Sequence, residues 1–177
     1  MPAAVAGAAA DPGHCTRRPA HITGLPIAGV TRRAVWADLA ALRALYLHLN
    51  PNTPPLSEDT ASAIWSDMLA RQGVTVFVRE VQAQLVATCM LITAPNLMRG
   101  GRPHGLIETV VTHRDFRRQG HGRAVMRAAL DAAWAEGCHN VMLLTGRTDP
   151  AVLRFYESCG FKAGVKTGLW ALRPTAS

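Results

Sequence analysis

The chain has 177 residues, a hydrophobic fraction of 49% and a formal net charge of +7. This length suits one domain with an ordinary buried core. The longest apolar runs, such as Leu85–Ile92, fall far short of the roughly 20 residues that a membrane-spanning helix needs, so we expect no membrane partner.

The cysteines and histidines show no metal-binding or disulfide pattern. Seven histidines lack HxxxH or HExxH spacing, and the four cysteines lack CxxC pairing: Cys15, Cys89, Cys138 and Cys159. We therefore expect no metal, reduced thiols and a cytoplasmic location. The arginines cluster around two glycines near position 120 instead of alternating with exposed aromatics along a groove, so we expect no nucleic-acid partner.

Residues 1–24 are rich in alanine, glycine and proline. They lack the basic start and the apolar centre of a secretory signal. We expect a flexible tail there and a single domain over residues 25–177.

The first half of this domain is predicted to hold one strand, two helices and a hairpin. Pro26–Ala34 predicts a short strand, and Val35–Leu49 predicts a helix because its leucines recur at helical spacing. Ser57 would cap a second helix that ends before Gly73. Alternating apolar residues then predict the two arms of the hairpin: Val74–Val81 and Leu85–Ala94.

The second half adds a β-α-β unit. Helical periodicity and boundary residues, including Asp149 and Pro150 as a helix start, support these assignments. In chain order we expect a strand, a helix, a strand, a helix and a last strand: Leu106–His113, Gly120–Gly137, His139–Gly146, Asp149–Gly160 and Gly168–Pro174. The resulting α/β (α+β) fold is a mixed, mostly antiparallel sheet with about four helices on both faces.

The turn around Gly120 and Gly122 has the features of an anion-binding site. The first N–H groups of a helix lack intrahelical partners and carry partial positive charge. Glycine lets a phosphate approach the backbone, and nearby arginines add charge and hydrogen bonds. Val125 occupies the third glycine position of a dinucleotide-binding turn, and no lysine follows as in a Walker loop. Both common phosphate-binding motifs are therefore excluded.

The pattern Arg-x-x-Gly-x-Gly begins at Arg117, with IETVV upstream and FYESCGF downstream. Together these segments resemble the GNAT superfamily of N-acetyltransferases, and the match covers about Leu85–Leu172 well. The resemblance implies a GNAT-like fold, a turn that holds the pyrophosphate of coenzyme A, and acetyl-CoA as cosubstrate. A glycine-opened helix with incidental arginines is the alternative.

The resemblance also implies which residues hold the coenzyme. Strand-edge backbone would contact the acetyl-pantetheine arm and the turn would cradle the pyrophosphate, with this set of residues: Val110, Val111, Thr112, Arg117, Arg118, Gln119, Gly120, His121, Gly122 and Arg123. Asp149 stands where the family often has Asn near the pantetheine, and capping the next helix is its alternative role. His121 is expected to face solvent or phosphate and to take no catalytic part.

Acetyl transfer to an amine needs a neutral amine, a stabilised oxyanion and a protonated leaving thiolate. A backbone N–H near Val111, freed by a bulge, would stabilise the oxyanion. Tyr156 matches a family tyrosine and would protonate the thiolate, with core packing as its alternative. Glu108 is the only acidic residue in its strand. It would act as base or orient the amine, with a solvated surface carboxylate as its alternative.

The predicted function is direct N-acetyl transfer from acetyl-CoA to a small-molecule amine. Cys89 and Cys159 lack the neighbours of a covalent nucleophile and are interpreted as small buried hydrophobes. Some segments look like glucosamine-6-phosphate N-acetyltransferases, but Thr109 replaces an Asp of those enzymes and LTGRTD replaces acidic residues. That substrate, protein amines and a non-catalytic coenzyme A-binding or partner-binding module are the alternatives. A homodimer is a reasonable expectation for a small enzyme.

Overall fold

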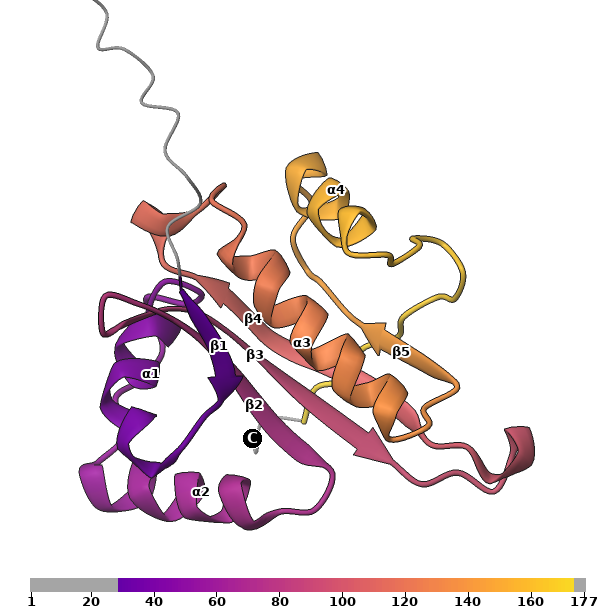
Figure 1. The fold of residues 1–177 in the computed structure, drawn as a ribbon, viewed down its shortest axis with the longest axis horizontal. Coiled ribbons are helices and arrows are strands. Elements are labelled where there is room, and N and C mark those ends of the chain that lie inside the picture. The colour runs from indigo at the N-terminus through magenta and orange to yellow at the C-terminus, as the bar shows by residue number, and fades with distance from the viewer. Residues whose placement is uncertain (1–28, 174–177) are drawn as a thin grey trace, which may run out of the picture.

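The computed structural model describes residues 29–173, so the tail predicted over 1–24 lies outside the described residues. Five strands form one sheet in the order β1-β2-β3-β4-β5 (Figure 1). Neighbours from β1 to β4 are antiparallel, whereas β4 and β5 are parallel. The strands are Val30–Arg33 (β1), Val74–Val81 (β2), Gln84–Ala94 (β3), His104–Thr112 (β4) and Asn140–Leu143 (β5). This confirms the mixed, mostly antiparallel sheet.

Helices cover both faces of the sheet, as the sequence predicts. Side chains of α1 and α2, including Leu42 and Trp65, pack on one face with Val78. On the other face α3 packs against Phe77 and Cys89, and Figure 1 shows it crossing in front of the sheet. The helices of the described residues are Leu39–Tyr46 (α1), Glu58–Ala70 (α2), His121–Ala135 (α3) and Pro150–Ser158 (α4), with short 3-10 turns at Trp36–Asp38 (η1), Arg99–Gly101 (η2) and Arg114–Phe116 (η3).

The buried side chains of α3 position the start of this helix against the sheet. Val125, Met126, Ala129 and Ala133 recur at helical spacing, and all four are fully buried. Burying a valine or methionine side chain contributes roughly 1.5–3 kcal/mol, and the alanines let the helix lie close to the sheet. These side chains thereby set the first turn of α3 beside the end of β4.

Strands β4 and β5 separate halfway along β4. Residues His104–Ile107 pair with Asn140–Leu143, and no later residue of β4 pairs with β5. The chain after β5 turns away towards α4 (Figure 1). The backbone of Glu108–Thr112 is therefore an open strand edge on that side, within the described part of the chain.

Two predicted elements differ from the structure. The helix predicted over Val35–Leu49 is divided into η1 and a shorter α1, because the Asp38 carboxylate accepts hydrogen bonds from the Val35 N–H (2.8 Å) and from Arg32 (2.7 and 2.9 Å). These bonds hold a separate turn before the helix. The last strand, predicted over Gly168–Pro174, is wrong: residues 168–173 form no strand. Its apolar pattern fits a strand, but a strand also needs a neighbouring strand to pair with.

Candidate active site

The turn before α3 leaves its first amides open. Gly120 is the N-cap of the helix and has a φ of 86°, the left-handed region that favours glycine. No side chain caps this helix, whereas Ser57 caps α2 and Asp149 caps α4. A Cβ at Gly120 would meet no atom within 4 Å. The residues present therefore fit a phosphate group, which could approach the backbone here.

Gly122 has a different role from the one expected. It is buried, and a Cβ there would lie 2.8 Å from Thr112 Oγ1 and 3.3 Å from the ring of Phe155. Contacts under 3.0 Å force neighbouring atoms to move. The second glycine of the motif thus lets α3 pack against β4 and α4, and only the first opens space for an anion.

The polar side chains of the turn hold its shape and leave positive charge exposed. Arg117 Nε donates to the Thr112 carbonyl (3.3 Å), Gln119 donates to the Asp115 carbonyl (3.0 Å), and Arg123 donates to Ser158 Oγ (3.1 Å). Among the ion pairs of residues 29–173, none involves an arginine of the predicted cradle: Arg117, Arg118 or Arg123. Their charge is therefore available to an anionic ligand.

His121 is buried, which corrects the expectation that it faces solvent or phosphate. Its side chain is 3% exposed and packs near Phe116, with ring centroids 6.1 Å apart. Burial lowers the pKa of His121, and the positive charge of Arg79 lowers it further. The buried ring is therefore not available to an anion, and only the backbone of His121 could contribute to the cradle.

Strand β4 carries the bulge expected near Val111, in its pairing with β3. Met90 of β3 pairs with Glu108, but Thr88 pairs with Val111, so Thr109 and Val110 both lie opposite a single residue of β3. Thr109 has a φ of 49°, an uncommon backbone conformation for a residue with a side chain. A bulge disrupts the regular ladder of hydrogen bonds, which is what the predicted oxyanion site requires.

Glu108 lies on β4, and Tyr156 lies on α4. Glu108 is half-buried and pairs with Met90, which packs with the side chains of α1 and α2. Tyr156 of α4 is also half-buried and packs with Phe155 and Phe161, at ring-centroid distances of 5.2 and 6.4 Å. Burial raises the pKa of Tyr156, and the charge of Glu108 contributes a smaller increase. The phenol is therefore protonated at neutral pH, as a general acid must be.

Comparisons with known proteins agree with this arrangement. The sequence model of the acetyltransferase (GNAT) family matches residues 41–161. The chain belongs to this family. It is 33% identical over 129 residues to the glucosamine 6-phosphate N-acetyltransferase of Trypanosoma brucei brucei, covering 72% of this chain and 84% of that protein. Acetyl transfer to an amine is accordingly its activity.

Solved structures of the GNAT family share the fold. A putative acetyltransferase from Agrobacterium tumefaciens is 46% identical, with a TM-score of 0.78 over 81% of this chain and 99% of that chain. The aminoglycoside N-acetyltransferase AAC(6')-Iy, solved in complex with CoA, is 16% identical, with a TM-score of 0.70 over 83% and 96% of the two chains. At that identity the likeness concerns the fold alone.

Asp149 and two of the cysteines have structural roles in this GNAT domain. Asp149 Oδ1 accepts a hydrogen bond from the Ala151 N–H (2.8 Å), so the capping role holds, and a coenzyme contact stays a prediction. Cys89 is fully buried, and burial raises its pKa to about 12. Cys159 is half-buried, and burial raises its pKa as well. Neither thiol is set to be a nucleophile, since the thiolate is the reactive form.

Sequence reasoning missed two residues that interact with parts of the predicted site: Tyr46 with Thr109 and Arg147 with Tyr156. Tyr46, at the end of α1, is half-buried, and burial raises its pKa while the Thr109 and Thr88 hydroxyls lower it. Arg147, in the loop between β5 and α4, donates from Nη2 to the Leu49 carbonyl (3.0 Å). Leucine periodicity assigned Tyr46 to a helix without indicating the β4 bulge beside it. Arg147 belongs to the segment LTGRTD, which was considered only for its lack of acidic residues.

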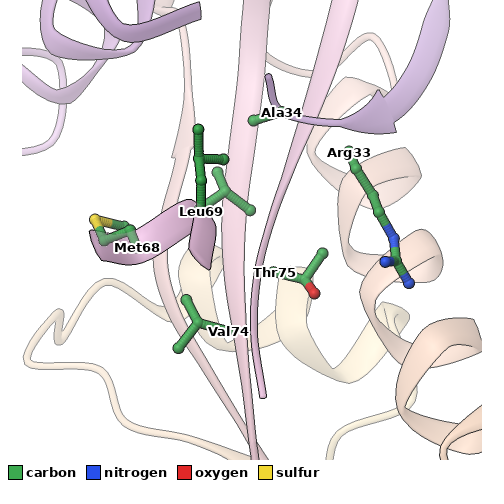
Figure 2. Close-up of a pocket in the computed structure, with 7 residues that line it drawn as sticks. Arg33, Ala34, Met68, Leu69, Val74 and Thr75 are labelled. Carbon is green, nitrogen blue, oxygen red and sulfur yellow. The ribbon is translucent and has the colours of Figure 1, made fainter. Parts of the chain in front are cut away.

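Other features of the described residues do not compete with this site. A shallow hollow of about 100 Å³ lies between β1, the end of α2 and the start of β2 (Figure 2). It is lined by Arg33, Ala34, Met68, Leu69, Val74, Thr75 and Val76, none of which belongs to the predicted site. Residues 29–173 hold no cluster of three metal-ligating side chains. Of the helices in this part of the chain, none combines the length and apolar character that crossing a bilayer takes.

Proposed function

We propose that the protein transfers the acetyl group of acetyl-CoA to the primary amine of a small molecule, by direct attack within a ternary complex. The observation that carries this proposal is the bulged strand β4, which is open on its β5 side after Ile107 and lies beside the uncapped start of α3. The CoA complex of the structural neighbour AAC(6')-Iy supports the choice of coenzyme. The small-molecule acceptor is supported by the acceptors named for the similar enzymes.

In this proposal the coenzyme lies between β4 and α4. The backbone of Val110–Thr112 would form hydrogen bonds with the pantetheine arm, as an added strand does at an open sheet edge. The first N–H groups of α3 would bind the pyrophosphate, and Arg117 and Arg118 would neutralise its charge. The open space at Gly120 and the absence of ion pairs on these arginines in the described structure support this placement.

The chemical step then needs one base, one oxyanion site and one acid. Glu108 would orient the incoming amine and accept its proton, directly or through water. As nitrogen bonds to the carbonyl carbon, the backbone N–H at the bulge near Val111 would stabilise the developing oxyanion. The bond from that carbon to sulfur breaks, and Tyr156 donates its proton to the departing thiolate. Solvent afterwards restores the protonation states of Glu108 and Tyr156.

The proposal extends to assembly and location. We propose a homodimer in which the C-terminal segment Val165–Leu172 contacts a second copy. Leu169 and Trp170 are 90% and 80% exposed, and among the described residues β5 pairs with no strand on its outer edge. An apolar segment beside an open edge is suited to strand pairing between chains.

A cytoplasmic location is supported by the unpaired thiols of Cys89, Cys138 and Cys159.

A thiol-release assay tests the proposed reaction. Purified protein with acetyl-CoA should release free coenzyme A only when an amine from a small-molecule panel is added. Tyr156→Phe should lower kcat by about a hundredfold, the low end of what a general acid contributes, with little change in KM for acetyl-CoA. Heat stabilisation by acetyl-CoA without turnover of any amine would instead indicate a binding module. If the chemical step limits the rate and Tyr156→Phe still has the wild-type kcat, Tyr156 only packs in the core.

A further inference from the structure

Arg147 connects the loop between β5 and α4 to the loop between α1 and α2. It lies between β5 and α4, and its Nη2 donates to the carbonyl of Leu49, just after α1. The other end of the α1–α2 loop is held in a similar way, because Arg43 donates to the Leu56 carbonyl (2.8 Å) and pairs with Glu58. The loop between α1 and α2 is therefore anchored at both ends by arginines.

The guanidinium of Arg147 keeps most of its binding capacity. An arginine has five N–H donors in a planar fork, and Arg147 forms one side-chain hydrogen bond within residues 29–173, to Leu49. The ion pairs of these residues do not include Arg147, in contrast to Arg43 and Arg32. Its side chain is exposed. An exposed arginine that is fixed in place and lacks a carboxylate partner is suited to recognise an anion.

Arg147 follows the point where β4 and β5 separate. Leu143, the last residue of β5, pairs with Ile107, which directly precedes Glu108, and Arg147 lies in the loop that leads from Leu143 to α4. The positive charge of Arg147 lowers the pKa of Tyr156, and the negative charge of Glu108 raises the pKa of the same phenol. Both charges therefore act on the phenol that would protonate the thiolate. A positive and a negative side chain that both act on this phenol match an acceptor that carries both an ammonium group and an anion.

We propose that Arg147 is a specificity-determining residue that selects amine acceptors bearing an anionic group, either a carboxylate or a phosphate. This inference rests on the proposed function and narrows its substrate class. Glu108 would attract the ammonium end of such a molecule, while the outer edge of the Arg147 guanidinium binds the anion and Nη2 keeps the Leu49 carbonyl. Polycationic amines would be disfavoured, because the chain carries a net charge of +7.

Matched acceptor pairs test this selection in the full-length protein. Glucosamine 6-phosphate is compared with glucosamine, and 4-aminobutyrate with its amide, by the initial rate of coenzyme A release. Wild-type kcat/KM should favour the anionic member of at least one pair, and the favoured pair identifies the anion as phosphate or carboxylate. Arg147→Gln should lower kcat/KM for that anionic member about 10- to 100-fold, the effect of losing a charged hydrogen bond. The neutral member should lose clearly less, because it has no anion for the guanidinium to bind.

Two variants and one binding measurement complete the test. Arg147→Lys should retain part of the preference, because it keeps the charge and loses the fork. Arg127→Gln, an exposed change on α3, should leave the preference intact. The shift in Tm of the CoA-saturated protein on adding each member of the same pairs reports binding without turnover. A preference in binding can therefore be detected even if the proposed chemistry fails. The proposal would be overturned if the anionic and the neutral acceptor of each pair gave equal kcat/KM and equal Tm shifts with the wild type. It would also be overturned if Arg147→Gln lowered kcat/KM equally for both acceptors.

Discussion

His121 is the residue at which the coenzyme turn differs most from its expected form. A histidine side chain stands in a buried position, and its Nε2 has no hydrogen-bond partner within the described structure. Burial and the charge of Arg79 hold the pKa of His121 below its usual range, so the ring is neutral in the folded protein at neutral pH. Protonation would place an unpaired charge under the first turn of α3.

This histidine should make stability depend on pH. A group whose pKa is lower in the folded state binds its proton more readily in the unfolded state. Its contribution to the free energy of unfolding is therefore present above the unfolded pKa of about 6.5 and is lost as pH falls towards the folded value. His121→Leu should shrink the fall in Tm between neutral and mildly acidic buffer, as measured by thermal denaturation. His104→Gln, at the half-buried start of β4, serves as the control. An unchanged pH dependence in His121→Leu would contradict the assignment.

At the scale of elements, the starts of α3 and α4 have different roles. Asp149 caps α4 with its own carboxylate, so the first amides of that helix are satisfied. The start of α3 has no such cap. The same physical feature, a helix start, is thus closed by a side chain in α4 and left open to a ligand in α3.

The capping role of Asp149 leads to a stability prediction. Asp149→Ala should lower the free energy of unfolding by about 1 kcal/mol, the usual effect of losing an N-cap, as measured by urea denaturation. Asp149→Asn should retain most of that stability, because Asn is also a good cap. It should leave acetyl-CoA affinity close to that of the wild type. A large loss of affinity in Asp149→Asn would show that the carboxylate itself contacts the coenzyme.

The elements also show what the sequence could and could not predict. Helix α3 and its glycine turn were predictable, because periodicity and the position of Gly120 are local signals. The packing role of Gly122 was not, since Thr112 and Phe155 become its neighbours only after β4, α3 and α4 have assembled. The buried state of His121 has the same origin. Arg147 was missed because its partner, the Leu49 carbonyl, comes from the other half of the chain.

At the scale of the whole molecule, the open edge of β5 and the exposed C-terminal segment belong together. The sequence predicted a strand over Gly168–Pro174, and the single chain forms none over residues 168–173. A strand pattern carries no information about which chain supplies its partner. A Cβ added at Gly168 would lie 2.9 Å from the Leu144 side chain, so the segment already passes near the end of β5.

The proposed homodimer can be tested by mass in solution. Light scattering coupled to size exclusion should give twice the chain mass for the wild type. Trp170→Ser should shift the protein towards the monomer, because it removes the largest exposed apolar side chain of the segment. Trp134→Ser, a change to another exposed tryptophan on α3, should leave the mass unchanged. A monomeric wild type, or a Trp170→Ser variant that stays dimeric, would refute the role given to this segment.

The net charge of +7 and the open start of α3 both favour a polyanionic coenzyme. Calorimetric titration of acetyl-CoA at near-neutral pH tests most directly whether the start of α3 binds this coenzyme. The titration compares the wild type, Gly120→Glu and the control variant Gly137→Glu. Both glycines have left-handed backbones and open surroundings, at opposite ends of α3, so the strain of substitution is matched. We predict saturable heat for the wild type and Gly137→Glu, and affinity lower by about a hundredfold or more for Gly120→Glu, since each charged hydrogen bond lost costs about 1.5–3 kcal/mol. No heat from the wild type, or unchanged affinity in Gly120→Glu, would contradict the account.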